Sequence, residues 1–178
     1  MRFQISHVST VPNHQTGRLT PLHTRANAAY FGAFGYELDL NALTDEDFEK
    51  IKEQVRFMKK YRRLFQFGVF YRLESPFDGN VTGWMVVSED KKEAAVGWFR
   101  VLSGPNQPYS RMRLRGLDEN FLYHISVRRE KENYYGNFYG DELMNIGLVT
   151  SDATSGQIPD GEGLSDFESR LFILEVKE

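Results

Sequence analysis

Cysteine is absent from the 178 residues of this chain. Disulfides, thiolate nucleophiles and zinc–thiolate or iron–sulfur sites are therefore excluded, and a reducing compartment is favoured. An excess of positive charge is also missing, since 22 Lys and Arg residues stand against 25 Asp and Glu residues, a net charge of −3. A nucleic-acid binder that works through bulk positive charge is thus not expected.

Long hydrophobic runs are lacking as well, because no stretch approaches the roughly 18 apolar residues of a membrane-spanning helix. Residues 1–7 are too polar for a signal peptide, so we expect a cytoplasmic protein without a membrane partner. Sequence signatures of a nucleophile elbow, a P-loop and a dinucleotide-binding turn are absent. The four histidines lack the spacing of a metal site, and we expect neither a metal nor another cofactor.

The chain divides into two parts with different periodicity. Residues 1–67 carry mainly helical signals, and residues 68–178 carry strand signals. The order strand, helix, strand, long helix and then strands is awkward for one small domain, because two helices cannot cover each other alone. We therefore expect residues 1–67 to be the end of a larger α/β unit, followed by a β domain.

Two helices are predicted in the first part. Thr20 as the N-cap and Pro21 at the first helical position indicate a short helix that ends before Gly32. Thr44 precedes an acidic turn that suits the start of a second helix, over about residues 45–66. An apolar stripe at steps of three and four residues marks its expected buried face: Phe48, Ile51, Val55, Met58, Tyr61 and Phe65.

The second part reads as short strands separated by turn signals. This alternation of short strands and turns predicts an antiparallel sandwich or barrel. The expected strands are Val69–Leu73, Thr82–Ser88, Ala94–Leu102, Arg111–Arg115, Leu122–Arg128, Ile146–Val149 and Phe167–Val176.

Aromatic residues make up 14% of the chain, which indicates a β-rich core or, alternatively, a surface on which sugar rings stack. Glu37 and Asp39 lie two residues apart in an extended segment, and could form a paired-carboxylate site. Like charges at this spacing more often point at separate cationic partners, and we favour that interpretation.

One run of residues carries a family resemblance. His7-Val8-Ser9-Thr10-Val11-Pro12-Asn13-His14-Gln15-Thr16-Gly17-Arg18 closely resembles bacterial α-galactosidases of glycoside hydrolase family 36. The resemblance covers nearly the whole chain and is densest over residues 7–40. It continues in Thr20-Pro21-Leu22, Thr24-Arg25, Phe31-Gly32, Phe34-Gly35-Tyr36-Glu37-Leu38-Asp39-Leu40, Gln66-Phe67-Gly68, Phe70-Tyr71-Arg72-Leu73, Trp84-Met85-Val86-Val87-Ser88, Tyr139-Gly140-Asp141-Glu142-Leu143-Met144-Asn145-Ile146-Gly147-Leu148 and Arg170-Leu171-Phe172.

The resemblance implies a fold and a reaction. Residues 1–67 would be the last elements of a (β/α)8 barrel, and residues 68–178 a C-terminal antiparallel β-sandwich, so that the fold class is mainly β. The family consists of retaining glycosidases that remove terminal α-galactosyl residues from oligosaccharides such as melibiose and raffinose. The implied partners are α-galactoside substrates, bound through the complete enzyme, and the rest of the barrel.

The family's two catalytic Asp residues have no counterpart here. The nucleophile follows Lys-Trp, whereas Trp84 and Trp98 are followed by Met and Phe. The acid/base lies in a Thr-Ser-Asp-Asn-Thr-Asp run. Ser151-Asp152 matches only part of this run, because the second Asp is missing. Retaining chemistry needs two carboxyls about 5 Å apart. We therefore assign no catalytic residue and expect the chain to be inactive alone.

The loop after the first strand supplies the candidate site. If Phe3–Val8 is a late barrel strand, this loop lies at the active-site face, where its side chains would position neighbouring groups or contact the sugar. The candidates are His7, Ser9, Asn13, His14 and Arg18. We also expect a homo-oligomer, because without barrel strands an apolar patch would be bare: Tyr30, Phe31, Phe34 and Tyr36.

The alternative is a non-catalytic carbohydrate-binding β-sandwich module. It would hold sugar through aromatic rings, at least two of them exposed and coplanar, whereas in an enzyme fragment the same rings would be core or interface. The rings in question are Trp84, Trp98, Tyr109, Tyr134 and Tyr135.

Overall fold

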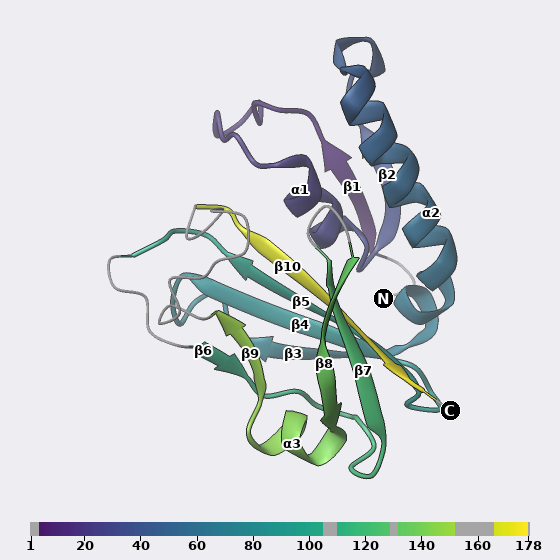
Figure 1. Ribbon diagram of the computed structural model, residues 1–178. Helices are drawn as coiled ribbons and strands as arrows, with labels where there is room; N and C mark the ends of the chain where they lie inside the picture. The colour runs from purple at the N-terminus through teal and green to yellow at the C-terminus, as the bar shows by residue number, and fades with distance from the viewer. Residues whose placement is uncertain (1–3, 105–109, 129–131, 152–165, 178) are drawn as a thin grey trace.

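The first part of the chain alternates strand and helix (Figure 1). The computed structural model describes residues 4–104, 110–128, 132–151 and 166–177. A parallel two-stranded sheet pairs β1 with β2, and α1 forms the crossover that parallel strands require. The elements in chain order are β1 (Ile5–Ser9), α1 (Leu22–Ala29), β2 (Ala33–Glu37), the 3₁₀ turn η1 (Leu40–Ala42) and α2 (Asp45–Phe67).

The start of α2 follows the sequence prediction. Thr44 accepts a hydrogen bond from the Asp47 N–H, and the Asp47 carboxylate accepts one from the Thr44 N–H, which together form a capping box. At α1 the prediction was wrong in detail. Pro21 occupies the cap position without a side-chain hydrogen bond, Thr20 does not cap, and the helix ends at Ala29.

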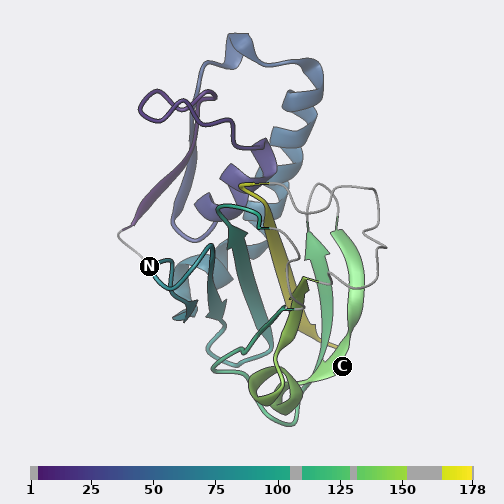
Figure 2. The same ribbon diagram turned by 90° about the vertical axis from the view of Figure 1, so that its left-hand side faces the viewer.

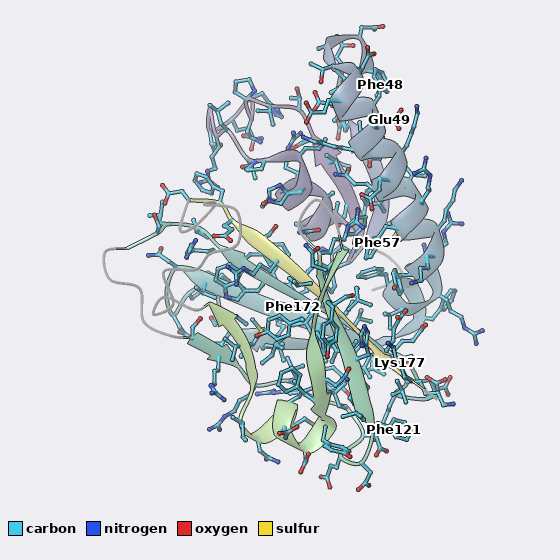
Figure 3. All side chains as sticks on the ribbon, in the orientation of Figure 1. Phe48, Glu49, Phe57, Phe121, Phe172 and Lys177 are labelled. Carbon is cyan, nitrogen blue, oxygen red and sulfur yellow. The ribbon has the colours of Figure 1, made fainter. Side chains whose placement is uncertain are left out.

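The buried face of α2 differs from the predicted stripe. Met58, Tyr61 and Phe65 are buried as expected, but Phe48, Ile51 and Val55 are only half-buried. The first turns of α2 extend beyond the sheet, and Figure 3 shows Phe48 at that far end while Phe57 lies nearer the sheet. The residues buried on the helix are Gln54, Phe57, Met58, Tyr61, Leu64 and Phe65.

The second part is built on a six-stranded antiparallel sheet in the order β3-β4-β5-β10-β7-β8. A two-stranded sheet of β6 and β9, with α3 beside it, forms a second layer (Figure 2). All seven predicted strands are present, whereas β8 and α3 were not predicted. The elements are β3 (Val69–Glu74), β4 (Val81–Val87), β5 (Glu93–Arg100), β6 (Ser110–Met112), β7 (Leu122–Arg128), β8 (Glu132–Tyr139), α3 (Gly140–Asn145), β9 (Leu148–Ser151) and β10 (Ser169–Val176).

Two hydrophobic cores lie on the two faces of the large sheet. Alternation along β10 sends Leu171 and Ile173 into the core against α1 and α2, and Phe172 and Leu174 into the core beneath β6, β9 and α3. Figure 3 shows Phe172 near the middle of the sheet. The chain is therefore mainly β, with an antiparallel sandwich after two β/α units, as predicted.

The predicted bare aromatic patch is largely covered by the chain itself. Tyr30 and Phe31 are 0% and 3% exposed, so the expectation was wrong for both. Phe31 packs edge-on against Trp84 of β4, and Gly97 of β5 leaves the space that its ring needs. Phe34 and Tyr36 remain half-buried beside α2.

Candidate functional site

The parallel pair of strands has one face covered by helices and one open face. Val8 is completely buried in the core against α1 and α2. Because successive side chains on a strand point to opposite faces, its neighbours on β1 point away from the helices. The register places three residues of β2 on the same side. This open face consists of Ile5, His7, Ser9, Ala33, Gly35 and Glu37.

The open face changes from apolar to polar along the strands. Ile5, at the start of β1, is 82% exposed, although isoleucine is normally buried. At the carboxyl end, His7 Nε2 lies 2.8 Å from Glu37 Oε2. Barrel enzymes pack apolar side chains in the interior and place their active sites at the carboxyl ends of the strands. The open face has the polarity expected of an inner wall of such a barrel.

The loop after β1 is held in shape by local hydrogen bonds. Asn13 Oδ1 accepts bonds from the N–H groups of Gln15 and Thr16, and the Asn13 N–H donates to the Arg18 carbonyl at 3.0 Å. Gly17 has a φ of +67°, a conformation that glycine adopts readily. The loop is therefore a compact turn.

Arg25 of α1 ties the base of this loop to the helix. Its guanidinium donates to the carbonyl oxygens of Ser9 and Thr20. Partial burial lowers the pKa of Arg25 from its ordinary value, and the Asp47 carboxylate opposes this shift. The end of β1 is thus fixed in relation to α1.

The five predicted site residues lie in different surroundings. His7 lies on the open face, and the Ser9 carbonyl accepts a hydrogen bond from the Arg25 guanidinium. Asn13 organises the turn, and His14 is exposed on the same loop. The Arg18 guanidinium lies 4.9 Å from the centroid of the Phe167 ring, near the start of β10. The structure joins Asn13 to Arg18 through the backbone, and it joins His7 to Glu37, a partner that the sequence did not predict.

Glu37 and Asp39 bind separate partners, as we favoured, but the expected cationic partner was wrong for Asp39. Glu37 pairs with His7, while Asp39 Oδ1 accepts hydrogen bonds from the backbone N–H and the side-chain amide of Asn41. Asp152, which partly matches the acid/base motif of the family, lies outside the described residues. Within residues 4–104, 110–128, 132–151 and 166–177, no three His, Asp or Glu side chains gather as metal ligands. No helix in these ranges is long and apolar enough to cross a membrane.

The rings of the alternative binding module are mostly in the core. Trp98 is 1% exposed, and Trp84 stacks on Phe99 with ring centroids 4.5 Å apart. Tyr135 packs edge-on against Phe172, and its hydroxyl donates to the Val149 carbonyl. Tyr134 is 63% exposed, and Tyr109 lies outside the described residues. Among the four rings that the structure describes, Tyr134 alone is exposed. The two exposed, coplanar rings that a binding module would need are therefore missing from these four.

Two β/α units followed by an antiparallel sandwich, with a polar carboxyl end on the inner face, define the end of a barrel glycosidase and its C-terminal β domain. The chain belongs to glycoside hydrolase family 36. Residues 81–174 match the family model described as "Glycosyl hydrolase family 36 C-terminal domain". Residues 3–68 match the model described as "Melibiase".

Similar proteins are α-galactosidases several times longer than this chain. AgaA of Geobacillus stearothermophilus is 52% identical over 144 residues, which are 81% of this chain and 19% of that protein. The bifunctional α-galactosidase/sucrose kinase AgaSK of Mediterraneibacter gnavus is 45% identical over 143 residues, 80% of this chain and 15% of that protein. The chain thus spans about a fifth or less of the length of these relatives.

Solved structures of the family superpose on nearly the whole chain. AgaB of G. stearothermophilus gives a TM-score of 0.84 at 45% identity and covers 97% of this chain and 22% of that chain. A variant of AgaA from the same organism, in complex with raffinose, gives 0.83 at 46% identity and covers 96% of this chain and 21% of that chain.

Proposed function

We propose that this chain is the C-terminal portion of a retaining α-galactosidase. Residues 1–67 form the last two β/α units of the catalytic barrel, and residues 68–178 form the β-sandwich. The complete enzyme hydrolyses terminal α-galactosyl residues of oligosaccharides such as melibiose and raffinose. The raffinose complex of the AgaA variant supports this substrate class.

The observation that carries the proposal is the polarity of the open face. Ile5, 82% exposed at the start of β1, is unsuited to a solvent-facing two-stranded sheet. It suits the inside of a barrel, where Ile5 packs in an apolar layer and the polar His7–Glu37 pair lies at the carboxyl ends of the strands and faces the substrate. In this position, His7 and the loop of Asn13, His14 and Arg18 position groups around the substrate.

The chain performs no hydrolysis by itself. A retaining glycosidase needs a nucleophile and an acid/base, carboxyls about 5 Å apart on either side of the scissile bond. The carboxylates at the carboxyl ends of β1 and β2 have other tasks, because Glu37 binds His7 and Asp39 binds Asn41. The two catalytic carboxyls belong to the remaining barrel strands.

An aryl α-galactoside assay tests the proposal. The purified chain is expected to give no turnover alone. Co-expressed with AgaA polypeptide that lacks the region matching this chain, it should restore hydrolysis of the aryl substrate and of raffinose. Turnover by the chain alone, abolished by Glu37→Gln, would overturn the proposal.

Location and assembly are further parts of the proposal. We place the enzyme in the cytoplasm, because its cysteine-free composition suits a reducing compartment. We also propose that the chain forms a homo-oligomer when the rest of the barrel is absent, because Phe34 and Tyr36 stay only half-buried. Size measurement of the purified chain by light scattering tests the second point.

A further inference from the structure

Phe167, which precedes β10, has a backbone conformation that its side chain disfavours. Its φ is +58°, in the left-handed region where glycine is favoured and a bulky residue is rare. Residues in such conformations persist only where the surrounding structure holds them, and they gather at functional sites. A phenylalanine at this position therefore needs a reason, which its contacts supply.

Hydrogen bonds to the segment after β5 hold the backbone of Phe167. The Phe167 N–H donates to the Val101 carbonyl at 3.0 Å. The carboxylate of the preceding residue, Asp166, accepts hydrogen bonds from the N–H and the hydroxyl of Ser103, at 2.7 Å and 2.9 Å. The sandwich itself thus fixes the direction in which the ring projects.

The ring of Phe167 meets the loop of residues 10–19, which joins β1 to α1. The Arg18 guanidinium lies 4.9 Å from the ring centroid, within the range of a cation–π contact. Figure 1 shows the start of β10, in yellow, below this loop. A planar guanidinium stacks well on an aromatic face. The contact therefore joins a residue of the sandwich to the loop at the carboxyl end of β1.

Arg18 is the point at which the sandwich acts on the shape of this loop. Arg25 of α1 binds the carbonyl oxygens at the two ends of the loop. The middle of the loop is held by local hydrogen bonds, in which the Asn13 N–H donates to the Arg18 carbonyl and the Gly17 N–H donates to the Asn13 carbonyl. The Phe167 ring adds a hold on the middle of the loop from outside the loop.

We propose that Phe167 is a positioning residue for the active site. Its ring holds the Arg18 guanidinium, so that the loop of residues 10–19 keeps one conformation at the carboxyl end of β1. The disfavoured backbone of Phe167 aims the ring at Arg18. This inference rests on the proposed function, since the loop serves the substrate only in the complete barrel. It gives the sandwich a part in substrate binding without contact with the substrate.

The proposal predicts an effect on KM. A loop that loses a hold samples several conformations, and only a fraction of the molecules is then ready for substrate. The apparent Kd rises by the inverse of that fraction, whereas saturating substrate selects the ordered loop again. Loss of the Phe167 ring should therefore raise the KM of the reconstituted enzyme about threefold to tenfold and change kcat less than about twofold.

Phe167→Ala and Phe167→Gly separate the ring from the backbone. Both remove the ring, but glycine adopts a φ of +58° without strain, so Phe167→Gly should have the higher Tm. Both should raise the KM for an aryl α-galactoside equally, and Phe167→Tyr, which keeps the ring, should restore it. The matched control is Phe121→Ala, which removes another half-buried phenylalanine, from the core beneath β6, β9 and α3 (Figure 3). It should lower the Tm and leave KM unchanged.

Arg18→Ala tests the partner of the ring. It should raise KM as Phe167→Ala does, and the double variant should raise KM no further, because both residues act through one contact. Hydrogen exchange of the chain alone gives a readout without activity. The Asn13 and Gly17 amides, which bond within the loop, should exchange faster in Phe167→Ala than in the wild type or in Phe121→Ala.

Four results would overturn the proposal: an unchanged KM in Phe167→Ala, a wild-type KM in Phe167→Gly, an equal rise in Phe121→Ala, or full additivity of the Arg18 and Phe167 substitutions. Failure of the proposed function is scored separately. A wild-type complex that forms without hydrolysing the aryl substrate contradicts the proposed function. The exchange rates of the Asn13 and Gly17 amides then decide whether Phe167 holds the loop.

Discussion

The Arg128 guanidinium at the end of β7 holds the Glu53 carboxylate of α2 through two hydrogen bonds, of which Nη1–Oε1 is 2.8 Å. The same guanidinium lies 4.2 Å from the centroid of the Phe57 ring. The Arg128 side chain is 4% exposed and that of Glu53 is 42% exposed. Burial raises the pKa of the neighbouring Tyr30 well above its ordinary value, so its phenol is neutral beside this pair. One residue of the sandwich thus anchors the last helix of the barrel end.

Arg128→Met should lower the free energy of unfolding by about 1–3 kcal/mol, because Glu53 loses two charge-assisted hydrogen bonds. The loss is limited because water still reaches the partly exposed Glu53 carboxylate. Urea denaturation measures this change. The control is Lys52→Met, which removes the exposed Lys52–Glu49 pair and should change the free energy of unfolding far less. Equal losses in the two variants would show that the Arg128–Glu53 pair contributes no more than a surface contact.

Ser169→Ala should cost about 1–3 kcal/mol, although it deletes a single oxygen. The Ser169 hydroxyl is buried, accepts a hydrogen bond from Asn27 Nδ2 at 3.0 Å and donates one to Thr24 Oγ1 at 2.9 Å. Its removal leaves the Asn27 amide buried without this acceptor. Thermal unfolding of Ser169→Ala, Asn27→Ala and the double variant measures the coupling, and the double variant should lose less than the sum of the two. Strict additivity would contradict a shared network.

The capping box of α2 predicts a pH dependence in acid. The Thr44 hydroxyl and then the Thr44 N–H, by hydrogen bonding the carboxylate, lower the pKa of Asp47 below its ordinary value. A carboxyl with a depressed pKa in the folded state stabilises the fold above its unfolded pKa, near 3.8, and loses this contribution as the pH falls through its folded pKa. Thr44→Ala should cost about 1 kcal/mol at neutral pH. The gap between variant and wild-type Tm should narrow below about pH 4, where Asp47 becomes protonated in both. A gap that stays constant down to pH 2 would contradict the assignment to Asp47.

The sequence predicts elements better than it predicts which faces meet. The bounds of α2 follow from Thr44 and an uninterrupted amphipathic pattern. Its buried face is offset from the predicted stripe, since Phe57 and Leu64 lie next to Met58 and Phe65 and periodicity alone cannot choose between adjacent stripes. Only packing against the sheet, through Arg128 among others, selects the face.

β8 was not predicted because strand-favouring and strand-disfavouring residues are mixed in it. Glu132–Tyr139 contains four aromatic residues, which favour strands, but they are interrupted by two asparagines and Gly136, and glycine and asparagine are depleted in sheets. Gly136 is present because the ring of Phe138 occupies the space of a Cβ atom. The His7–Glu37 pair escaped prediction for another reason. It depends on the register between β1 and β2, which are connected through α1 and which bring together two residues 30 positions apart in the sequence.

His7→Ala should reduce activity of the reconstituted enzyme more than it reduces stability. The His7 and Glu37 side chains are 45% and 73% exposed in this chain, so their contact contributes at most about 1 kcal/mol to folding. If the open face is the inner wall of the barrel, Glu37 lies at the carboxyl ends of the strands, where the substrate binds. Loss of the imidazole then leaves the Glu37 carboxylate without the contact that orients it. A residue that orients a group at an active site typically costs about 10-fold to 100-fold in activity when removed.

His124→Ala is the matched control, because His124 is another histidine on a strand, bound to Asn137 at 3.0 Å, in the sandwich rather than on the open face. His7→Gln should recover part of the activity, since its amide can still donate a hydrogen bond to Glu37. The measurements are kcat and KM for an aryl α-galactoside beside the Tm of each complex. If the activity of His7→Ala falls only in proportion to its unfolded fraction, or if His124→Ala loses as much, the pair has a structural role and the open face does not reach the substrate.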